Sequence, residues 1–459
     1  MTSPIGQSQG RLRGMARTLY DAAGSVLAVL LFPAYALLWL LVTYPLVVYS
    51  FLLPLLSLLI YRYGRLLWAV PPLVALSIPL LLFGMIKHDL LPRIVKRNQL
   101  VFAIFAVVMV FEVLALAYTG LSGSNFFLGR MGFLLVAVAV AVNATNVKTM
   151  ELSLFAITVG VAVLGVLTIL HALDIFSLPV ALDKLPARAF LGYRFPVPRT
   201  LGIGMSYGKF GIMASVAMVT LIFSTLSPYR IIKSLPLRIV LFLAVVSGIL
   251  ISQGRGVFLT VTTVSLFSVV AALQMRRAAV LGPQAAMSRS WLLLFAVMAI
   301  LAIAVGGFLP TVAELDIVDV ETVNSLDNAA GRVQINRIAV DLLLQNPLFG
   351  IGHGNFVGMA GMGTGIHNHF VEQYVATGFI GGSFYLLFYL LLLLSAWRAF
   401  VRGTSLAVRM VAAIFFAGYM AVLLEYLVFP GFLAEAAAWL TGLILALNTL
   451  LEDGPGETV

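Results

Sequence analysis

Long apolar runs with few charges recur along the whole chain, and they constrain the fold more than any other feature of the sequence. The runs are about 18 to 28 residues long, enough for an α-helix to cross a hydrocarbon core about 30 Å thick. Charged residues make up only 10% of the 459 residues, whereas a soluble domain carries about 25%. Alternating strands typical of membrane barrels are absent. The sequence therefore predicts an all-α polytopic membrane protein.

The apolar runs predict about twelve transmembrane helices with both chain ends in the cytoplasm. The predicted spans are 34–60, 66–86, 100–118, 130–147, 152–172, 205–225, 237–252, 256–273, 291–309, 370–397, 408–427 and 431–451. We divide the chain into an interfacial or cytoplasmic segment, a transmembrane bundle with a periplasmic loop at 173–204, a large periplasmic loop, and C-terminal helices with a short cytoplasmic tail. These four parts are residues 1–33, 34–309, 310–369 and 370–459.

Basic residues between the spans predict the orientation, because lysine and arginine mark the cytoplasmic side of a membrane protein. Four basic clusters fall on one side of the predicted spans, and both long loops then face the periplasm. We therefore assign the net charge of +10 to topology and not to a nucleic-acid partner. The clusters are Lys87, Arg93, Lys96 and Arg97; Arg230, Lys233 and Arg238; Arg276, Arg277 and Arg289; and Arg398, Arg402 and Arg409.

Several arginines lie on the predicted periplasmic side, against this charge rule. Arg194 and Arg199 lie in the 173–204 loop, Arg332 in the 310–369 loop, and Arg255 between two glycines in ISQGRGVFLTV. The planar guanidinium suits bidentate recognition of phosphate, so these arginines could hold a lipid diphosphate. Snorkelling to ordinary lipid phosphates is the alternative for the loop arginines. For Arg255, at the junction of two spans, we favour the diphosphate.

Histidines gather in the stretch from His353 to GIHNHFVEQYVATGFIGG, residues 365–382. Imidazole titrates near neutrality, so His367 at a wet membrane interface could take a proton from a hydroxyl. We expect Asn368 either to orient His367 or to cap the following helix. We interpret His369 as a supporting group, behind His367 or in the site of an acceptor. Glu112, near the end of a predicted span, we interpret as structural.

Two helical features flank the histidines. Residues 331–345 carry apolar side chains at helical spacing and end before Asn346–Pro347, which predicts an amphipathic helix on the outer surface. Gly378, Gly381 and Gly382 fall at positions i, i+3 and i+4, a spacing that lets a helix dock closely in lipid. The sequence therefore predicts a polar tip on a tightly docked helix.

A metal site is an alternative for the same polar residues. His367, His369 and Glu372 could bind a transition metal, with His353 completing the set of ligands. However, the helical rise leaves His367 and Glu372 poorly aligned. We therefore predict neither a metal nor another cofactor.

The pattern His367–Asn368, Gly378 and Gly381–Gly382 resembles the signature of the O-antigen ligase and O-antigen polymerase superfamily. Three further segments also resemble that family. They are the preceding NPLFGIGHGNF, in which His353 lies, the pair Gly331–Arg332, and the SQGRG turn around Arg255. The resemblance implies a metal-independent inverting glycosyltransferase of the GT-C type in the bacterial inner membrane, active on the periplasmic side. The donor would be an undecaprenyl diphosphate-linked glycan, and the acceptor a sugar hydroxyl.

The resemblance also implies roles for individual residues. His367 matches the essential histidine of the family, a proposed general base. Arg255 matches an arginine assigned to the diphosphate, and Arg332 a further arginine. Arg194 and Arg199 lie where the family carries additional arginines, and no motif fixes which of them aligns.

The acceptor and the partners stay open at the level of the sequence. A polymerase would extend a lipid-linked repeat unit of O-antigen or exopolysaccharide, whereas a ligase would transfer the glycan to lipid A–core. We favour the polymerase slightly, because the 310–366 loop is bulky. A chain-length regulator is a further partner to consider. A transporter of lipid-linked sugars is a remoter alternative, because a transporter is expected to show internal repeats and we find none.

Overall fold

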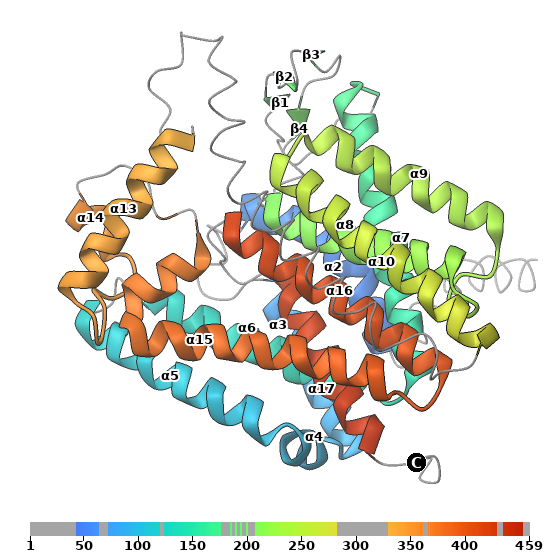
Figure 1. Cartoon of the computed structure of the whole chain (residues 1–459), viewed down its shortest axis with the longest axis horizontal. Coiled ribbons are helices and arrows are strands. Elements are labelled where there is room, and N and C mark those ends of the chain that lie inside the picture. The colour runs from blue at the N-terminus through green and yellow to red at the C-terminus, as the bar shows by residue number, and fades with distance from the viewer. Residues whose placement is uncertain are drawn as a thin grey trace, which may run out of the picture.

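The computed structural model describes residues 43–63, 72–119, 124–175, 184–185, 189–190, 193–194, 199–200, 207–281, 329–360, 366, 368–428 and 435–452. The described chain is predominantly helical (Figure 1). Its helices are α2 (Pro45–Tyr63), α3 (Pro72–His88), α4 (Leu91–Arg97), α5 (Gln99–Thr119), α6 (Ser124–Asn143), α7 (Val147–Ala172), α8 (Tyr207–Leu226), α9 (Leu235–Ser252), α10 (Arg255–Leu281), α13 (Ala329–Gln345), α14 (Asn355–Ala360), α15 (His369–Arg402), α16 (Leu406–Val428) and α17 (Glu435–Glu452).

Four two-residue strands lie between α7 and α8, in the loop that the sequence predicts there. They are β1 (Lys184–Leu185), β2 (Ala189–Phe190), β3 (Tyr193–Arg194) and β4 (Arg199–Thr200). β1 pairs with β4 and β2 with β3, both antiparallel. β4 also contacts α7 and α9, so this strand packs against the bundle.

Seven helices of the described chain are long and apolar enough to cross a membrane, and α3 with α4, which meet at 96°, would form an eighth, broken span. The shorter apolar helices are Pro45–Leu55, Phe127–Asn143 and Glu435–Leu451. The described part of each predicted span coincides with a helix to within several residues. The span 291–309 and the first residues of the spans 34–60 and 66–86 lie outside the described residues. The prediction of a helical multi-pass membrane protein is confirmed, and the number twelve stays a prediction.

Contacts between helix ends place predicted basic clusters together. Ser227 follows directly after α8, and its Oγ lies 3.6 Å from Sδ of Met410 in the first turns of α16. At the same junction, the Tyr229 hydroxyl donates to Glu151 Oε1 of α7 at 2.6 Å, and this bond raises the pKa of Tyr229 to about 12. The clusters at the α8–α9 and α15–α16 junctions therefore share one end of the bundle, which we call the basic end.

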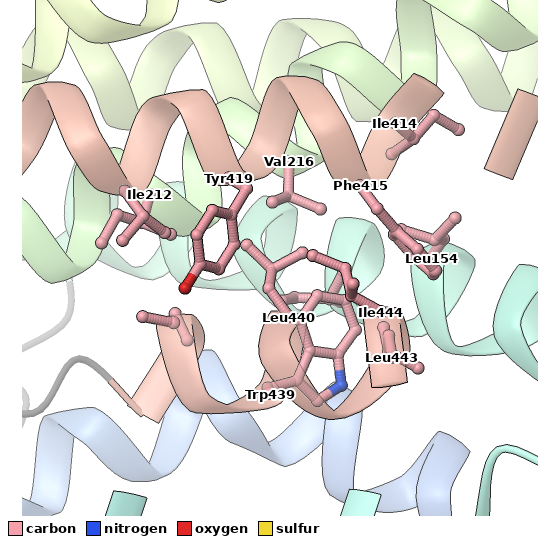
Figure 2. Close-up of a cluster of buried hydrophobic side chains, with 14 of the residues drawn as sticks. Leu154, Ile212, Val216, Ile414, Phe415, Tyr419, Trp439, Leu440, Leu443 and Ile444 are labelled. Atoms are coloured by element: carbon pink, nitrogen blue, oxygen red, sulfur yellow. The ribbon is translucent and has the colours of Figure 1, made fainter. Parts of the chain in front are cut away.

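The core lies where α7, α8, α16 and α17 meet, and Figure 2 shows its interlocking side chains. Trp439 and Tyr419 are fully buried there. The Trp439 indole N–H donates to Ser50 Oγ of α2 at 2.9 Å, so the polar atom of this large side chain is satisfied. Close packing of apolar side chains holds such helices together in lipid, where water supplies no driving force.

The amphipathic helix predicted at 331–345 is confirmed as α13. Its buried face carries Ile335, Ala339, Leu342 and Leu343, as the spacing predicts. The helix ends at Gln345, directly before Asn346–Pro347. α13 and α14 both pack against α15, at the end where α15 begins (Figure 1). This group of elements positions the histidine segment.

Candidate functional site

A break at Gly378 divides α15 into two segments. Gly378 has φ 73° and ψ −178°, a non-helical conformation inside the helix. A β-carbon there would lie 2.3 Å from the backbone carbonyl of Leu348. The predicted single helical face of three glycines is therefore wrong at Gly378, because its positive φ interrupts the helix. Gly381 and Gly382 follow the break, and Gly381 faces Phe111 of α5 at close range.

The loop between α13 and α14 docks onto this break. A broken helix leaves carbonyl and N–H groups without helical partners, and such groups are costly in a membrane unless the protein satisfies them. Here the loop satisfies them. Ile351 N–H donates to Val375 O at 2.9 Å, Gly352 N–H to Ala376 O at 2.9 Å, and Phe379 N–H to Pro347 O at 2.7 Å.

Glycines give the loop the shape that this docking needs. Gly350, Gly352 and Gly354 all have positive φ, between 70° and 80°. At Gly350 a β-carbon would lie 2.4 Å from the carbonyl oxygen of Val375. Only a residue without a β-carbon allows such a close approach of two backbones. The conformation carries His353 inward, against α5.

His353 lies in a buried polar cluster centred on Glu112 of α5. His353 Nε2 is 2.9 Å from Glu112 Oε2, and the side chains are 3% and 1% exposed. Glu112 Oε1 accepts from Arg130 Nε of α6 at 3.3 Å and from the Tyr385 hydroxyl of α15. The Arg130 guanidinium also lies over the Tyr385 ring, 4.9 Å from its centroid. We call Glu112, Arg130, His353 and Tyr385 the Glu112 cluster.

The charges of the Glu112 cluster compensate one another. An isolated carboxylate or guanidinium inside a protein costs several kcal/mol, and still more where lipid surrounds the helices. Glu112 and Arg130 form a pair of opposite charge, and the hydroxyl and imidazole supply further polar contacts. The arrangement ties α5, α6, α15 and the 346–354 loop to one carboxylate.

His369 lies beside this cluster and is completely buried. The centroid of its ring lies 4.5 Å from the ring centroid of Tyr426 in α16 and 6.3 Å from that of Tyr385. Its Nδ1 is 3.4 Å from Gln373 Nε2 and 3.9 Å from Glu372 Oε2. The imidazole of His369 is thus enclosed by aromatic rings and by the side chains of its own helix.

The residues next to His367 are anchored on both sides. Ile366 is buried in the apolar cluster beneath α13. Asn368 is the N-cap of α15, and its Oδ1 accepts from the Val371 N–H at 3.1 Å. Of the two roles expected for Asn368, helix capping is therefore confirmed. His367 itself lies outside the described residues.

The predicted arginines are placed by their backbone elements alone, because their side chains lie outside the described part of the chain. Arg194 belongs to β3, Arg199 to β4 and Arg332 to α13. Arg255 is the first residue of α10. β4 contacts α9, the helix that leads into α10 (Figure 1).

Helix α16 connects the beginnings of α10 and α15. It packs against both helices, and near its C-terminus Tyr426 touches His369 while the buried Glu425 lies near Thr260 of α10. Thr260 follows Arg255 by five residues, so the two lie less than two helical turns apart. The beginnings of α10 and α15 are therefore at the same end of the bundle, which we call the site end.

An apolar groove of about 600 Å³ opens between α5 and α6. Its walls come from Phe105, Met109 and Val113 of α5 and from Phe127, Met131 and Leu134 of α6. Glu112 and Arg130 are chain neighbours of these wall residues. The groove thus lies on the two helices that carry the charged pair of the Glu112 cluster.

Sequence reasoning interpreted Glu112 as structural and did not single out Arg130 or Tyr385. A signal was present, because a carboxylate and a guanidinium in consecutive apolar spans are costly apart and commonly pair. Their connection to His353 has no such signal, since the contact joins residues far apart in the chain. Among the described residues, no three histidine or carboxylate side chains are grouped as metal ligands.

These features define a multi-pass helical membrane protein with a buried polar cluster behind the start of one helix. Residues 239–386, from α9 to beyond the break in α15, match the family model described as O-antigen ligase. This match agrees with the resemblance of the His367 motif to the O-antigen ligase and O-antigen polymerase superfamily. No curated protein matches the chain.

Proposed function

We propose that this protein is an inverting glycosyltransferase that moves a glycan from undecaprenyl diphosphate to a sugar hydroxyl on the periplasmic side of the bacterial inner membrane. The family match at residues 239–386 carries the proposal. The anchored neighbours of His367 support it, because a catalytic group must be held in a defined position.

The reaction has one displacement step. The acceptor oxygen attacks the anomeric carbon, and the bond between that carbon and the diphosphate oxygen breaks. Undecaprenyl diphosphate leaves, and the configuration at the anomeric carbon is inverted. His367 takes the proton of the acceptor hydroxyl. Because the leaving group gains negative charge in the transition state, nearby guanidinium groups stabilise it. Arg255 is our first choice for this role, with Arg199, Arg194 and Arg332 as further contacts.

The apolar groove between α5 and α6 supports a lipid-linked donor. Its walls are apolar side chains, and it lies on the helices that carry Glu112 and Arg130. An isoprenoid chain in this groove would bring its diphosphate toward a polar part of the protein without leaving the membrane.

We expect purified protein in lipid nanodiscs to release undecaprenyl diphosphate from a synthetic lipid-linked glycan only when an acceptor sugar is present. Chelation of divalent metals should leave the rate unchanged, because arginines and not a metal ion hold the leaving group. Chromatography of the lipid product measures the release. Movement of intact donor across a bilayer without release would instead support a transporter.

Polymerase and ligase are the two versions of this reaction, and we favour the polymerase slightly. The long 310–366 segment between spans offers more surface for a growing glycan than a compact ligase needs. The glycan of a deletion strain separates them. A strain with single units still attached to lipid A–core indicates a polymerase, whereas a strain without any units indicates a ligase.

The orientation can be measured with single cysteines, because the chain has no native cysteine. Met359→Cys, on the exposed face of α14 at the site end, should react with an impermeant maleimide added to spheroplasts. Thr404→Cys, in the exposed turn between α15 and α16 at the basic end, should react only after the membrane is opened. The cysteine-free parent controls for background. The reverse labelling pattern would refute a periplasmic site.

A further inference from the structure

We propose that Glu112 is a positioning residue that, together with His353, holds the beginning of α15 in the geometry required for transfer. This inference rests on the proposed function and adds to it a residue outside the matched region 239–386. The residue lies on α5, far from the histidine motif in the chain.

The first step concerns the 346–354 loop. His353 is its single ionisable residue, and three glycines with positive φ shape its second half. A glycine-rich backbone has many alternative conformations. The contact of His353 with Glu112, at 2.9 Å and away from solvent, therefore selects one of them.

The second step concerns the helix break. The loop donates two N–H groups to the carbonyls of Val375 and Ala376, at the end of the first segment of α15. Beyond the break, Tyr385 donates its hydroxyl to the same Glu112 carboxylate. Glu112 is thus connected to both sides of the break, through the loop on one side and directly on the other.

The third step leads to His367. The first segment of α15 runs from His369 to Thr377 and is capped by Asn368. A segment this short has little stability of its own, so its direction depends on what the break and the loop impose. A change in that direction moves the cap, and His367 adjoins the cap in the chain.

Stability alone gives no reason for a carboxylate at this position. Apolar residues of similar volume commonly serve as well as a buried ion pair, or better. A guanidinium, an imidazole and a hydroxyl that converge on one carboxylate instead define a particular arrangement of α5, α6, α15 and the loop. Positioning is the role that uses this arrangement.

The test compares Glu112→Gln with wild type in the transfer assay. We expect kcat to fall about tenfold or more, because small displacements of reacting groups have large effects on rate, while KM for the donor changes less than about twofold. His353→Gln should have a similar effect. The double variant should be no slower than the slower single variant, since both changes break the same contact.

Glu151→Gln is the matched control. Glu151 is a similarly buried carboxylate that accepts from the Tyr229 hydroxyl at the basic end. This change should lower thermal stability without lowering kcat. If Glu112→Gln and Glu151→Gln reduce activity equally, and only in proportion to the folded fraction, Glu112 is not a positioning residue.

A second measurement is independent of activity. Spin labels on Met359→Cys in α14 and Val110→Cys in α5, both exposed, report the distance between the loop region and α5. We expect Glu112→Gln to broaden the distance distribution and Glu151→Gln to leave it unchanged. An unchanged distribution in Glu112→Gln would overturn the inference. A wild-type protein without transfer activity would instead refute the proposed function, and the label distances would still decide whether Glu112 holds the loop.

Discussion

Replacing His367 with alanine is expected to reduce the acceptor-dependent release of undecaprenyl diphosphate by about a thousandfold. A positioned general base contributes about 10²- to 10⁴-fold to a rate, and the acceptor hydroxyl is a poor nucleophile while it keeps its proton. Donor binding should survive, because the guanidinium groups that we propose as contacts of the diphosphate are unchanged. Single-turnover kinetics with saturating donor and a separate donor-binding measurement would check both parts.

His171→Ala is the matched control for this experiment. His171 is a buried histidine in the last turn of α7, and we assign it no role in the reaction. Its replacement should change kcat less than about twofold. A His367→Ala protein that folds, binds donor and keeps more than about a tenth of the wild-type rate would exclude His367 as the base. The proton acceptor would then have to be another group.

Local patterns account for the parts of the fold that the sequence predicts well. Apolar runs of sufficient length have few alternatives to membrane helices, so the described parts of the predicted spans coincide with helices to within several residues. The amphipathic pattern of α13 and the cap at Asn368 depend on residues within a few positions of each other. Such patterns can be interpreted without knowing the rest of the fold.

The Glu112 cluster is not local, and for that reason it escaped prediction. Arg130 lies 18 positions from Glu112 and Tyr385 lies 273 positions away. Two opposite charges in consecutive spans hint at the pair with Arg130, but nothing in the sequence around Glu112 indicates its contacts with Tyr385 and His353. A lone carboxylate in an apolar run is therefore recognisable as unusual, whereas its task depends on how distant helices pack.

Gly378 shows how one pattern can fit two structures. Glycines three and four positions apart permit close helix packing, and glycine also permits a helix to break at positive φ. The spacing to Gly381 and Gly382 favoured the first interpretation. The second is correct at Gly378, because the 346–354 loop needs space for its backbone at this point.

Gly378→Ala is expected to destabilise the site by about 3 kcal/mol or more and to abolish transfer activity. A non-glycine residue at φ 73° and ψ −178° costs about 1–3 kcal/mol in backbone strain. The new β-carbon would also lie 2.3 Å from the Leu348 carbonyl, a backbone group that cannot rotate away. The loop must then leave the break, and the carbonyls of Val375 and Ala376 lose their partners. Thermal unfolding and the transfer assay measure the two effects.

Gly358→Ala in α14 is the matched control, because a β-carbon there would meet no atom within 4 Å. This variant should unfold at the wild-type temperature or slightly above it, since alanine favours helix over glycine, and should keep its activity. If Gly378→Ala instead kept full activity, the docked loop would be dispensable for catalysis. The series of contacts from Glu112 through His353 to the start of α15 would then have no effect on activity, because Gly378 is the point at which the loop meets the helix.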